Sequence, residues 1–384
     1  MNKIEQTKSL LNQYNSGHSI NFKDLAVCIH EMSVNHIYDP SLSLAIEVLI
    51  SNIQRINKQD YLWIEDMLNT LISISKHISE LEFNDTDSYV ITNAYYNESC
   101  SGVGDFIRGC CFLKRMFKDT NVKVQIDFEN HYLGKYIKSS TPKFREDIFD
   151  TEKYNKDLCS PRTYFANMII NMKHAIKLLK ENKSMNILTN FSDYVSLDPP
   201  LRSEYQLNDY EISFMRKNIL FEKKVIDYVN NIGITDFTLV HFRLGDREML
   251  GIDNLDENNQ NTKNYNVNYE ECVDKINTIA ANTNNKIVVI SDSNKFKKML
   301  KNNEMITCPH LKSDHCSHNP GYIQDYNVNH QKKKEAMFYV AVDMYLSSIA
   351  QNIHSYSVYP WGSGFVFWIS KIFNVPISTH IIRE

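Results

Sequence analysis

The sequence predicts an α/β protein in which a mainly parallel sheet is built in two successive halves, preceded by a stretch of helices. In residues 88–128 a strand pattern, a glycine-bearing turn, a helix pattern and a second strand pattern follow one another. Strand and helix patterns alternate again over residues 237–373. Such alternation is typical of parallel sheets with helical crossovers. The first stretch, of roughly 85 residues, instead carries apolar side chains at helical spacing.

Size and charge narrow the class of protein. A chain of 384 residues exceeds the size of a typical domain of ~150 residues, and 42% hydrophobic with 23% charged residues is ordinary globular usage. With 46 acidic and 42 basic residues the net charge is −4, which argues against nucleic acid or an anionic membrane as partner. No run approaches the ~18 apolar residues of a membrane span, and the first 15 residues lack an apolar signal core. We therefore expect a cytoplasmic protein.

The N-terminal segment, residues 1–86, is predicted to be a helical module. Its helices are expected at residues 22–34, 40–56 and 61–81. Two interpretations stay open: the module mediates contacts with a protein partner, or it is a structural cap on the next domain.

Residues 87–205 form the first predicted α/β domain. A β-branched apolar run and an alternating run indicate two strands, and helical spacing lies between them. A polar stretch at 139–163 is expected to be an excursion from the sheet. The predicted elements are strands at 88–94, 122–128 and 185–188, and helices at 105–118 and 164–181.

Residues 206–384 form the second predicted α/β domain. It contains an almost wholly polar loop at 253–268 and a loop-rich stretch at 303–330. The predicted helices lie at 207–229, 269–281, 295–302 and 332–351, with a last one from 364, and the strands at 237–242, 286–290 and 353–358.

The eight cysteines are scattered along a long chain, so we interpret them as reduced thiols rather than a disulfide framework. One short stretch gathers potential zinc ligands, but their spacing fits no zinc finger or ribbon. A polar loop with incidental thiols is therefore favoured over a structural metal. The ligands in question are Cys308, His310, His315, Cys316 and His318.

Ligands of open parallel sheets bind beyond the carboxyl ends of the strands, and a first such turn reads GVGDFIRG at residues 102–109. Gly102 and Gly104 would let a ligand or another backbone approach closely, and the following helix start favours anions. The spacing is not a dinucleotide fingerprint, because Ile107 stands where the third glycine would be. Asp105 opens the helix, and Arg108 faces either a bound anion or solvent.

A second turn carries His241, Arg243 and Asp246. His241 and Arg243 lie two apart on a strand and therefore share a face. At the carboxyl end of that strand, a planar guanidinium suits the oxygens of a pyrophosphate. The alternative is an ion pair between Arg243 and Asp246 that braces the turn.

A third turn, Gly362, Ser363 and Gly364, follows Trp361 and leads into an apolar helix. Ser363 is placed as a helix N-cap, and its hydroxyl with the first helical N–H groups could hold a phosphate. An ordinary cap would explain the serine but not the clustered glycines and tryptophan.

Two aspartates complete the predicted site. Asp292, in Ser291-Asp292-Ser293, could accept hydrogen bonds from a base or ribose, or could cap the helix that follows. Asp343 lies among apolar residues of a predicted helix, where a carboxylate is costly without a partner such as the donor edge of a purine.

Together these residues resemble the GDP-fucose-dependent fucosyltransferase superfamily, which includes α1,2-, α1,6- and protein O-fucosyltransferases. The His-x-Arg-x-Gly-Asp signature at 241–246 is the most specific part, and the likeness spans roughly residues 88–378. The resemblance implies a GT-B fold, in which two Rossmann-like domains face a cleft. It also implies an inverting enzyme that needs no metal or other cofactor and transfers fucose from GDP-fucose to a glycan hydroxyl.

The resemblance also implies roles for single residues. Arg243 would neutralise the departing diphosphate and His241 would contact the nucleotide. Asp292 and Asp343 would read guanine or ribose. The donor-binding residues implied are Gly102, Gly104, Asp105, Arg108, His241, Arg243, Asp292, Ser293, Asp343, Gly362, Ser363 and Gly364.

The sequence departs from this pattern in one place, because several relatives have Arg-Arg where this chain has Arg243-Leu244. An inverting displacement needs a base for the acceptor hydroxyl, and Asp246 and Glu248 are the nearest carboxylates. Two other functions therefore stay open: transfer from a different nucleotide-sugar, and non-catalytic binding of a nucleotide or carbohydrate.

Overall fold

The computed structural model describes most of the predicted α/β region. The described residues are 3–34, 41, 45, 48, 83–97, 102–138, 148–150, 164–190, 207–245, 248, 267–300, 306–312, 329–359 and 362–382. The predicted helix at 61–81 and the polar loop at 253–266 lie outside them, as does the predicted helix at 40–56 except for residues 41, 45 and 48, which are helical. Also outside the described residues are Asp246, Trp361, His315, Cys316 and His318.

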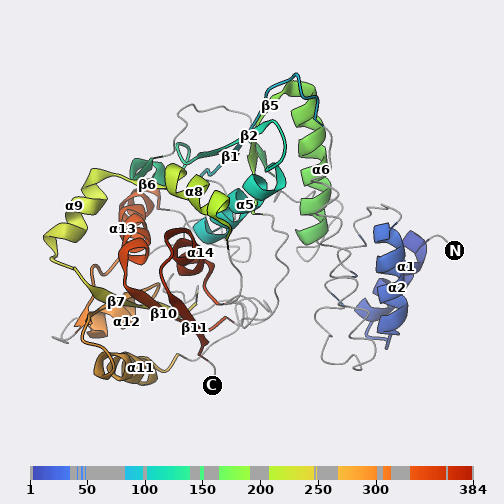
Figure 1. The fold of residues 1–384 in the computed structure, drawn as a ribbon. Helices are drawn as coiled ribbons and strands as arrows, with labels where there is room; N and C mark the ends of the chain where they lie inside the picture. The colour runs from blue at the N-terminus through green and yellow to red at the C-terminus, as the bar shows by residue number, and fades with distance from the viewer. Residues whose placement is uncertain are drawn as a thin grey trace. The chain divides into compact units, whose positions relative to one another are not determined.

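The described chain is a mixed α/β structure with parallel sheets, as predicted (Figure 1). Its residues divide into two compact units. One comprises 1–92, 112–124 and 146–195, and the other 93–111, 125–145 and 196–384. The GT-B arrangement and the domain boundaries after residues 86 and 205 stay predictions.

A four-stranded sheet has the strand order β2-β1-β5-β4. Burial alternates along β1 and β2, as expected for strands with one more exposed face. The strand β4 lies inside the stretch predicted to be a polar excursion. That prediction was wrong there, because β4 is only three residues long and shows no repeating pattern. The elements are β1 (Tyr89–Ala94), α5 (Val103–Met116), β2 (Val122–Asp127), β4 (Ile148–Asp150), α6 (Tyr164–Asn182) and β5 (Ser184–Leu188).

The helices with described bounds before this sheet are α1 (Lys3–Asn15) and α2 (Phe22–Val34). The bounds predicted for α2 are confirmed. The two helices contact each other through buried side chains, where the Thr7 hydroxyl donates to the Met32 sulfur over 3.3 Å. The role predicted for this segment is not tested by these contacts.

A five-stranded sheet has the order β11-β10-β7-β8-β9, and each neighbouring pair is parallel. The central strand β7 is buried at every residue except Arg243, as expected for a strand with neighbours on both sides and helices above and below. Val240, Phe242 and Leu244 belong to a core cluster with α11 and α12, so His241 and Arg243 belong to the opposite face. The elements are β7 (Phe237–Arg243), α11 (Tyr269–Ala281), β8 (Lys286–Ser291), α12 (Asn294–Leu300), β9 (Ile306–Thr307), α13 (His330–Ile349), β10 (Asn352–Ser357), α14 (Gly364–Phe373) and β11 (Ile377–Ile381).

The single helix predicted over 207–229 is two helices, α8 (Asp209–Asn218) and α9 (Lys223–Asn231). A short strand, β6 (Leu220–Phe221), separates them and pairs antiparallel with β3 (Ile137–Lys138), which follows the 3-10 helix η2 (Tyr132–Lys135). The helical pattern is interrupted at β6, because its pairing with β3 supplies backbone hydrogen bonds in place of those that a continuous helix would have made.

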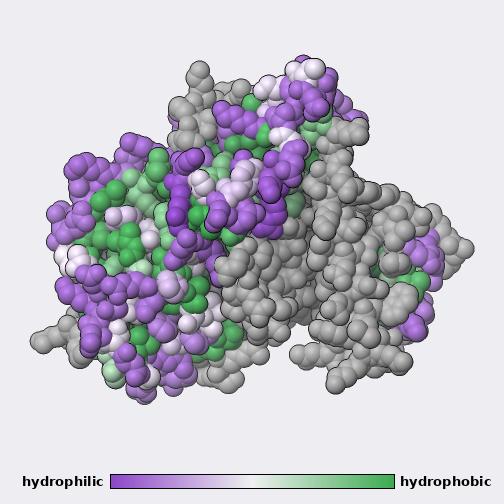
Figure 2. Space-filling model, in the orientation of Figure 1, coloured by the Kyte–Doolittle hydropathy of each residue, from purple (hydrophilic) through white to green (hydrophobic). Residues whose placement is uncertain are grey.

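On the drawn face in Figure 2, hydrophilic residues alternate with areas where hydrophobic residues gather. The large apolar side chains that are exposed are Leu220, Ile232, Met299 and Ile349. Among the described helices, none combines the length and the apolar character that a membrane span requires.

Candidate functional site

Arg243 and the turn before α14 lie side by side at the carboxyl end of the five-stranded sheet. Strands β7 and β10 are neighbours, with Ser357 opposite Arg243, and the Val358 N–H donates to the Arg243 carbonyl over 3.0 Å. The Arg243 guanidinium carbon is 5.5 Å from the centre of the Tyr359 ring. The chain then reaches the start of α14 within five residues. This is the edge at which open α/β sheets bind their ligands.

The first turns of α5 and α14 meet at the predicted glycines. A β-carbon on Gly104 would lie 2.6 Å from the Gly364 carbonyl carbon and 2.8 Å from the Phe365 nitrogen. Only glycine permits an approach this close. Each helix start presents N–H groups without intrahelical partners and the positive end of a helix dipole. The contact therefore brings two anion-favouring helix starts together.

The turn before α14 is shaped by Gly362, which has a φ of +72°. Ser363 occupies the N-cap position, as predicted, and is buried. Its hydroxyl makes no capping hydrogen bond to the helix, so an ordinary serine cap does not account for it.

In the glycine-bearing segment at residues 102–109, the two charged residues pair with each other. Arg108 Nη1 lies 3.3 Å from Asp105 Oδ1, one helical turn away on α5. Arg108 was predicted to face either a bound anion or solvent. The structure adds a carboxylate partner within its own helix. Gly102 directly precedes α5.

Asp292 is the partner of Arg243. Its Oδ2 accepts from Arg243 Nη1 over 2.6 Å and from the Gly245 N–H over 3.1 Å, and its Oδ1 accepts from the Leu244 N–H over 2.8 Å. The interpretation of Asp292 as a helix cap is wrong. The Ser293 hydroxyl has that role, since it accepts from the Phe296 N–H over 3.1 Å.

Glu248 is held by two hydroxyl groups. Its Oε2 accepts a hydrogen bond from Ser293 Oγ over 2.9 Å and another from Tyr269 Oη. Burial and the neighbouring Glu248 raise the pKa of Tyr269, which keeps the phenol protonated and able to donate. Ser293 was predicted as a donor-binding residue, whereas Tyr269 was predicted only as the start of a helix.

His241 is buried within the sheet. Its Nδ1 lies 3.0 Å from Ser355 Oγ on the adjacent strand, and its ring lies 6.4 Å from that of Phe365 in α14. Burial, and secondarily the charge of Arg243, lower the pKa of His241 to about 3. The imidazole is therefore neutral near pH 7 and can serve as a hydrogen-bonding group but not as a cation.

Asp343 has a protein partner where a purine was expected. Its Oδ1 lies 2.7 Å from His310 Nε2, and the His310 ring packs 4.7 Å from that of Tyr339. The other ring nitrogen, Nδ1, is buried and has no hydrogen-bond partner within the described part of the chain. The expectation that this carboxylate would need a partner is confirmed, but the partner comes from the loop after β9.

Of the five potential zinc ligands in this loop, Cys308 and His310 are described, and the alternative of a metal there stays a prediction. Burial raises the pKa of Cys308 to about 11, which keeps its thiol protonated when no metal is bound. Within the part of the chain that the structure describes, no three His, Cys, Asp or Glu side chains are grouped so as to hold a metal ion.

Lys297 is a site neighbour that the sequence did not reveal. Its side chain is fully buried, and its Nζ donates to the Lys312 carbonyl over 2.9 Å. Burial lowers its pKa, while the nearby charges of Asp343 and Asp292 act in the opposite direction. The run Asn294–Leu300 contains three lysines, so its pattern gave no reason to separate this one from solvent-exposed neighbours.

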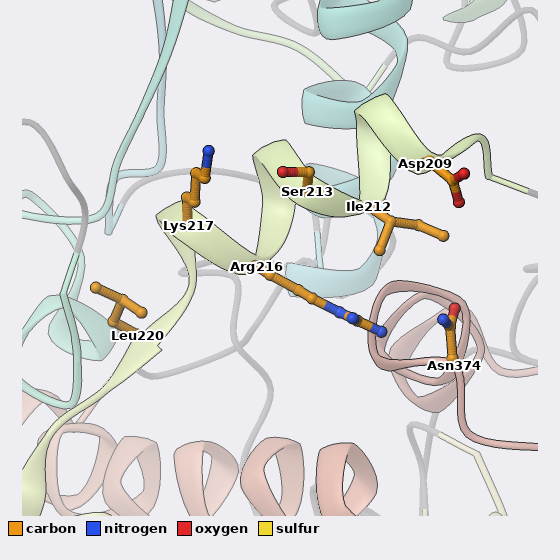
Figure 3. A pocket seen from close by; sticks show the side chains of 7 residues that line it. All are labelled: Asp209, Ile212, Ser213, Arg216, Lys217, Leu220 and Asn374. Carbon is orange, nitrogen blue, oxygen red and sulfur yellow. The ribbon is translucent and has the colours of Figure 1, made fainter.

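A shallow cavity of about 550 Å³ lies elsewhere, along α8 (Figure 3). Arg216 crosses it toward the end of α14 and donates through Nε to the Ile372 carbonyl over 2.7 Å. Asn374 lines it just after α14 ends. The cavity is thus at the opposite end of α14 from Gly364 and is separate from the residues described above.

Comparison with known proteins gives little beyond this geometry. No protein-family model and no curated protein matches the sequence. One solved structure to which the chain is similar is POFUT1, a GDP-fucose protein O-fucosyltransferase, in complex with GDP. The match covers 80% of this chain and 78% of that chain at 9% identity and a TM-score of 0.25. A TM-score this low carries no argument about fold, substrate or mechanism.

Proposed function

We propose that this protein is an inverting glycosyltransferase that uses a nucleotide diphosphate sugar, with GDP-fucose as the donor and a glycan hydroxyl as the acceptor. The observation that carries the proposal is the placement of Arg243 beside Ser357 and Tyr359, in the segment that leads into α14, together with the packing of the start of α5 against the start of α14 through Gly104 and Gly364. This arrangement is a cradle for a dianionic group at the carboxyl end of a parallel sheet.

The chemistry follows from where charge develops. When the bond between the anomeric carbon and the diphosphate oxygen breaks, negative charge accumulates on the leaving diphosphate. A guanidinium offers paired N–H donors to phosphate oxygens, and each helix start adds the positive end of a helix dipole. Donors arranged in advance for that charge are usually the largest single contribution to such a rate enhancement.

The acceptor hydroxyl must lose a proton as its oxygen bonds to the anomeric carbon from the opposite side. Glu248 is the described carboxylate proposed to take it. Hydrogen bonds from Tyr269 and Ser293 to its Oε2 fix its position. Asp246 remains the other candidate base. The proposal of guanosine as the nucleoside rests on the resemblance, which implies that Asp343 reads guanine or ribose. In this chain Asp343 would do so together with its partner His310.

A different nucleotide-sugar is the second candidate. Leu244 stands where several members of the resembled superfamily carry a second arginine, and its side chain is buried in the core cluster with Phe242 and Cys272. No cation is available from that position, so the sugar diphosphate must be held differently here, which favours testing more than one donor.

Calorimetry with GDP, GDP-fucose and UDP-glucose, followed by a transfer assay, tests the proposal. We expect GDP to bind and Arg243→Ala to lower turnover by about 10²–10³-fold, the usual cost of removing one donor to a developing oxyanion. Arg216→Ala, an arginine outside the site, is the matched control and should retain turnover. Absence of any nucleotide binding would refute the transferase, and binding without turnover toward any donor would indicate a non-catalytic binding protein.

A further inference from the structure

We propose that Asp292 is a positioning residue that acts through Arg243, rather than a residue that reads the base or ribose. This inference rests on the proposed function, since it assigns the role of Asp292 within the same site. The carboxylate accepts hydrogen bonds from three consecutive residues at the end of β7: the Arg243 guanidinium and the N–H groups of Leu244 and Gly245.

The buried setting of Asp292 makes these bonds necessary. Its side chain is 8% exposed and that of Arg243 is 20% exposed, so an unpaired carboxylate there would carry a large desolvation cost. Gly245, at a φ of +113°, turns the backbone where a side chain would strain it. The turn and the guanidinium are thus fixed by one carboxylate that follows the adjacent strand, β8.

The two carboxylate oxygens have separable roles. Oδ1 accepts from the Leu244 N–H, whereas Oδ2 accepts from both Arg243 and Gly245. Asparagine keeps one acceptor oxygen, but in either orientation of its amide an NH₂ group, itself a donor, faces N–H groups that the carboxylate accepted from. Asp292→Asn therefore preserves side-chain volume while removing the charge opposite Arg243 and weakening the hold on the guanidinium and the turn.

Loss of this alignment should affect catalysis more than binding. Misplacement of a catalytic group by about 1 Å costs on the order of 10²-fold in rate. The helix starts at Gly104 and Gly364 remain in Asp292→Asn, so GDP should still bind. We expect turnover to fall by about 10²-fold and the dissociation constant for GDP to change by less than about tenfold.

Asp227→Asn is the matched control, because it makes the same substitution in an ion pair of 2.7 Å with Lys223 that lies on the surface of α9. It should leave turnover unchanged. A double-mutant cycle then separates positioning from a general structural role. If Asp292 acts through Arg243, Asp292→Asn has no further effect on turnover in the Arg243→Ala background.

Two results overturn the inference: wild-type turnover in folded Asp292→Asn, or the same fractional loss in the presence and absence of Arg243. If Asp292→Asn does not fold, Asp292→Glu decides instead. It keeps the charge but moves it by one methylene, and wild-type turnover in that variant overturns the inference. If the unmodified protein binds no nucleotide, the proposed function itself fails, which calorimetry on the wild type distinguishes at the outset.

Discussion

Gly104→Ala tests whether the meeting of α5 and α14 is as close as the structure indicates. The new β-carbon would lie 2.6 Å from the Gly364 carbonyl carbon and 2.8 Å from the Gly364 oxygen and the Phe365 nitrogen. Comfortable separations between carbon atoms are about 3.5–4.0 Å. All three obstructing atoms are backbone, so relief requires the two helix starts to move apart by roughly 1 Å.

That displacement has two expected consequences. Overpacking of this kind lowers the free energy of unfolding by about 1–3 kcal/mol. Separation of the helix starts by about 1 Å should also lower the rate of transfer by on the order of 10²-fold, because the cradle no longer fits its anion. Urea unfolding followed by circular dichroism measures the first effect, and calorimetry with GDP and the transfer assay measure the second.

Gly102→Ala is the control for stability. Its β-carbon would meet only Asp105 Oδ2, at 3.7 Å, which is ordinary van der Waals contact. Glycine is favoured over alanine at the position just before a helix, so this variant should lower the free energy of unfolding by at most about 1 kcal/mol. If Gly104→Ala unfolds at the same urea concentration as Gly102→Ala and binds GDP as the wild type does, the inferred contact between the helix starts is wrong.

Two further predictions concern buried histidines. His241 has a pKa of about 3 in the folded protein against an ordinary value of 6.5, so between these values the unfolded chain binds a proton that the folded chain does not. The stability present above pH 6.5 should therefore decline as the pH falls toward 3. His241→Gln should reduce that decline in the urea midpoint, and an unchanged pH profile would contradict the assignment. Asp343→Ala should lower the free energy of unfolding by about 1–3 kcal/mol, because it leaves a buried ring nitrogen of His310 without its hydrogen-bond partner. Asp227→Ala breaks an exposed ion pair and should lower the free energy of unfolding by no more than about 1 kcal/mol. An equal loss of stability in the two variants would contradict the assignment of Asp343 as the buried partner of His310.

Elements with strong local signals were predictable from the sequence. The bounds of the helices 22–34 and 269–281 are confirmed, and strand β7 extends only one residue beyond its predicted end. The helix at 269–281 begins after Asn268, whose side chain accepts from the N–H groups of Glu270 and Glu271. Such caps depend on residues within a few positions of one another, so the sequence contains them directly.

Elements that depend on distant pairing were not predictable. The helical pattern over 207–229 is interrupted by β6, which exists because residues 220–221 pair with 137–138. Strands β4, β9 and β11 are short or lie on few apolar residues, and each is defined by its neighbour in the sheet. Periodicity carries no information about which segment lies alongside.

The candidate site divides in the same way. Arg243, Asp292 and the glycine turns could be placed at the ends of strands before the structure was known, because strand ends follow from local hydrophobic patterns. Their partners emerge only in the folded chain: Asp292 for Arg243, His310 for Asp343, and Gly364 for Gly104. A buried charge or a close backbone approach must be satisfied in three dimensions, by whichever group the packed chain brings within reach.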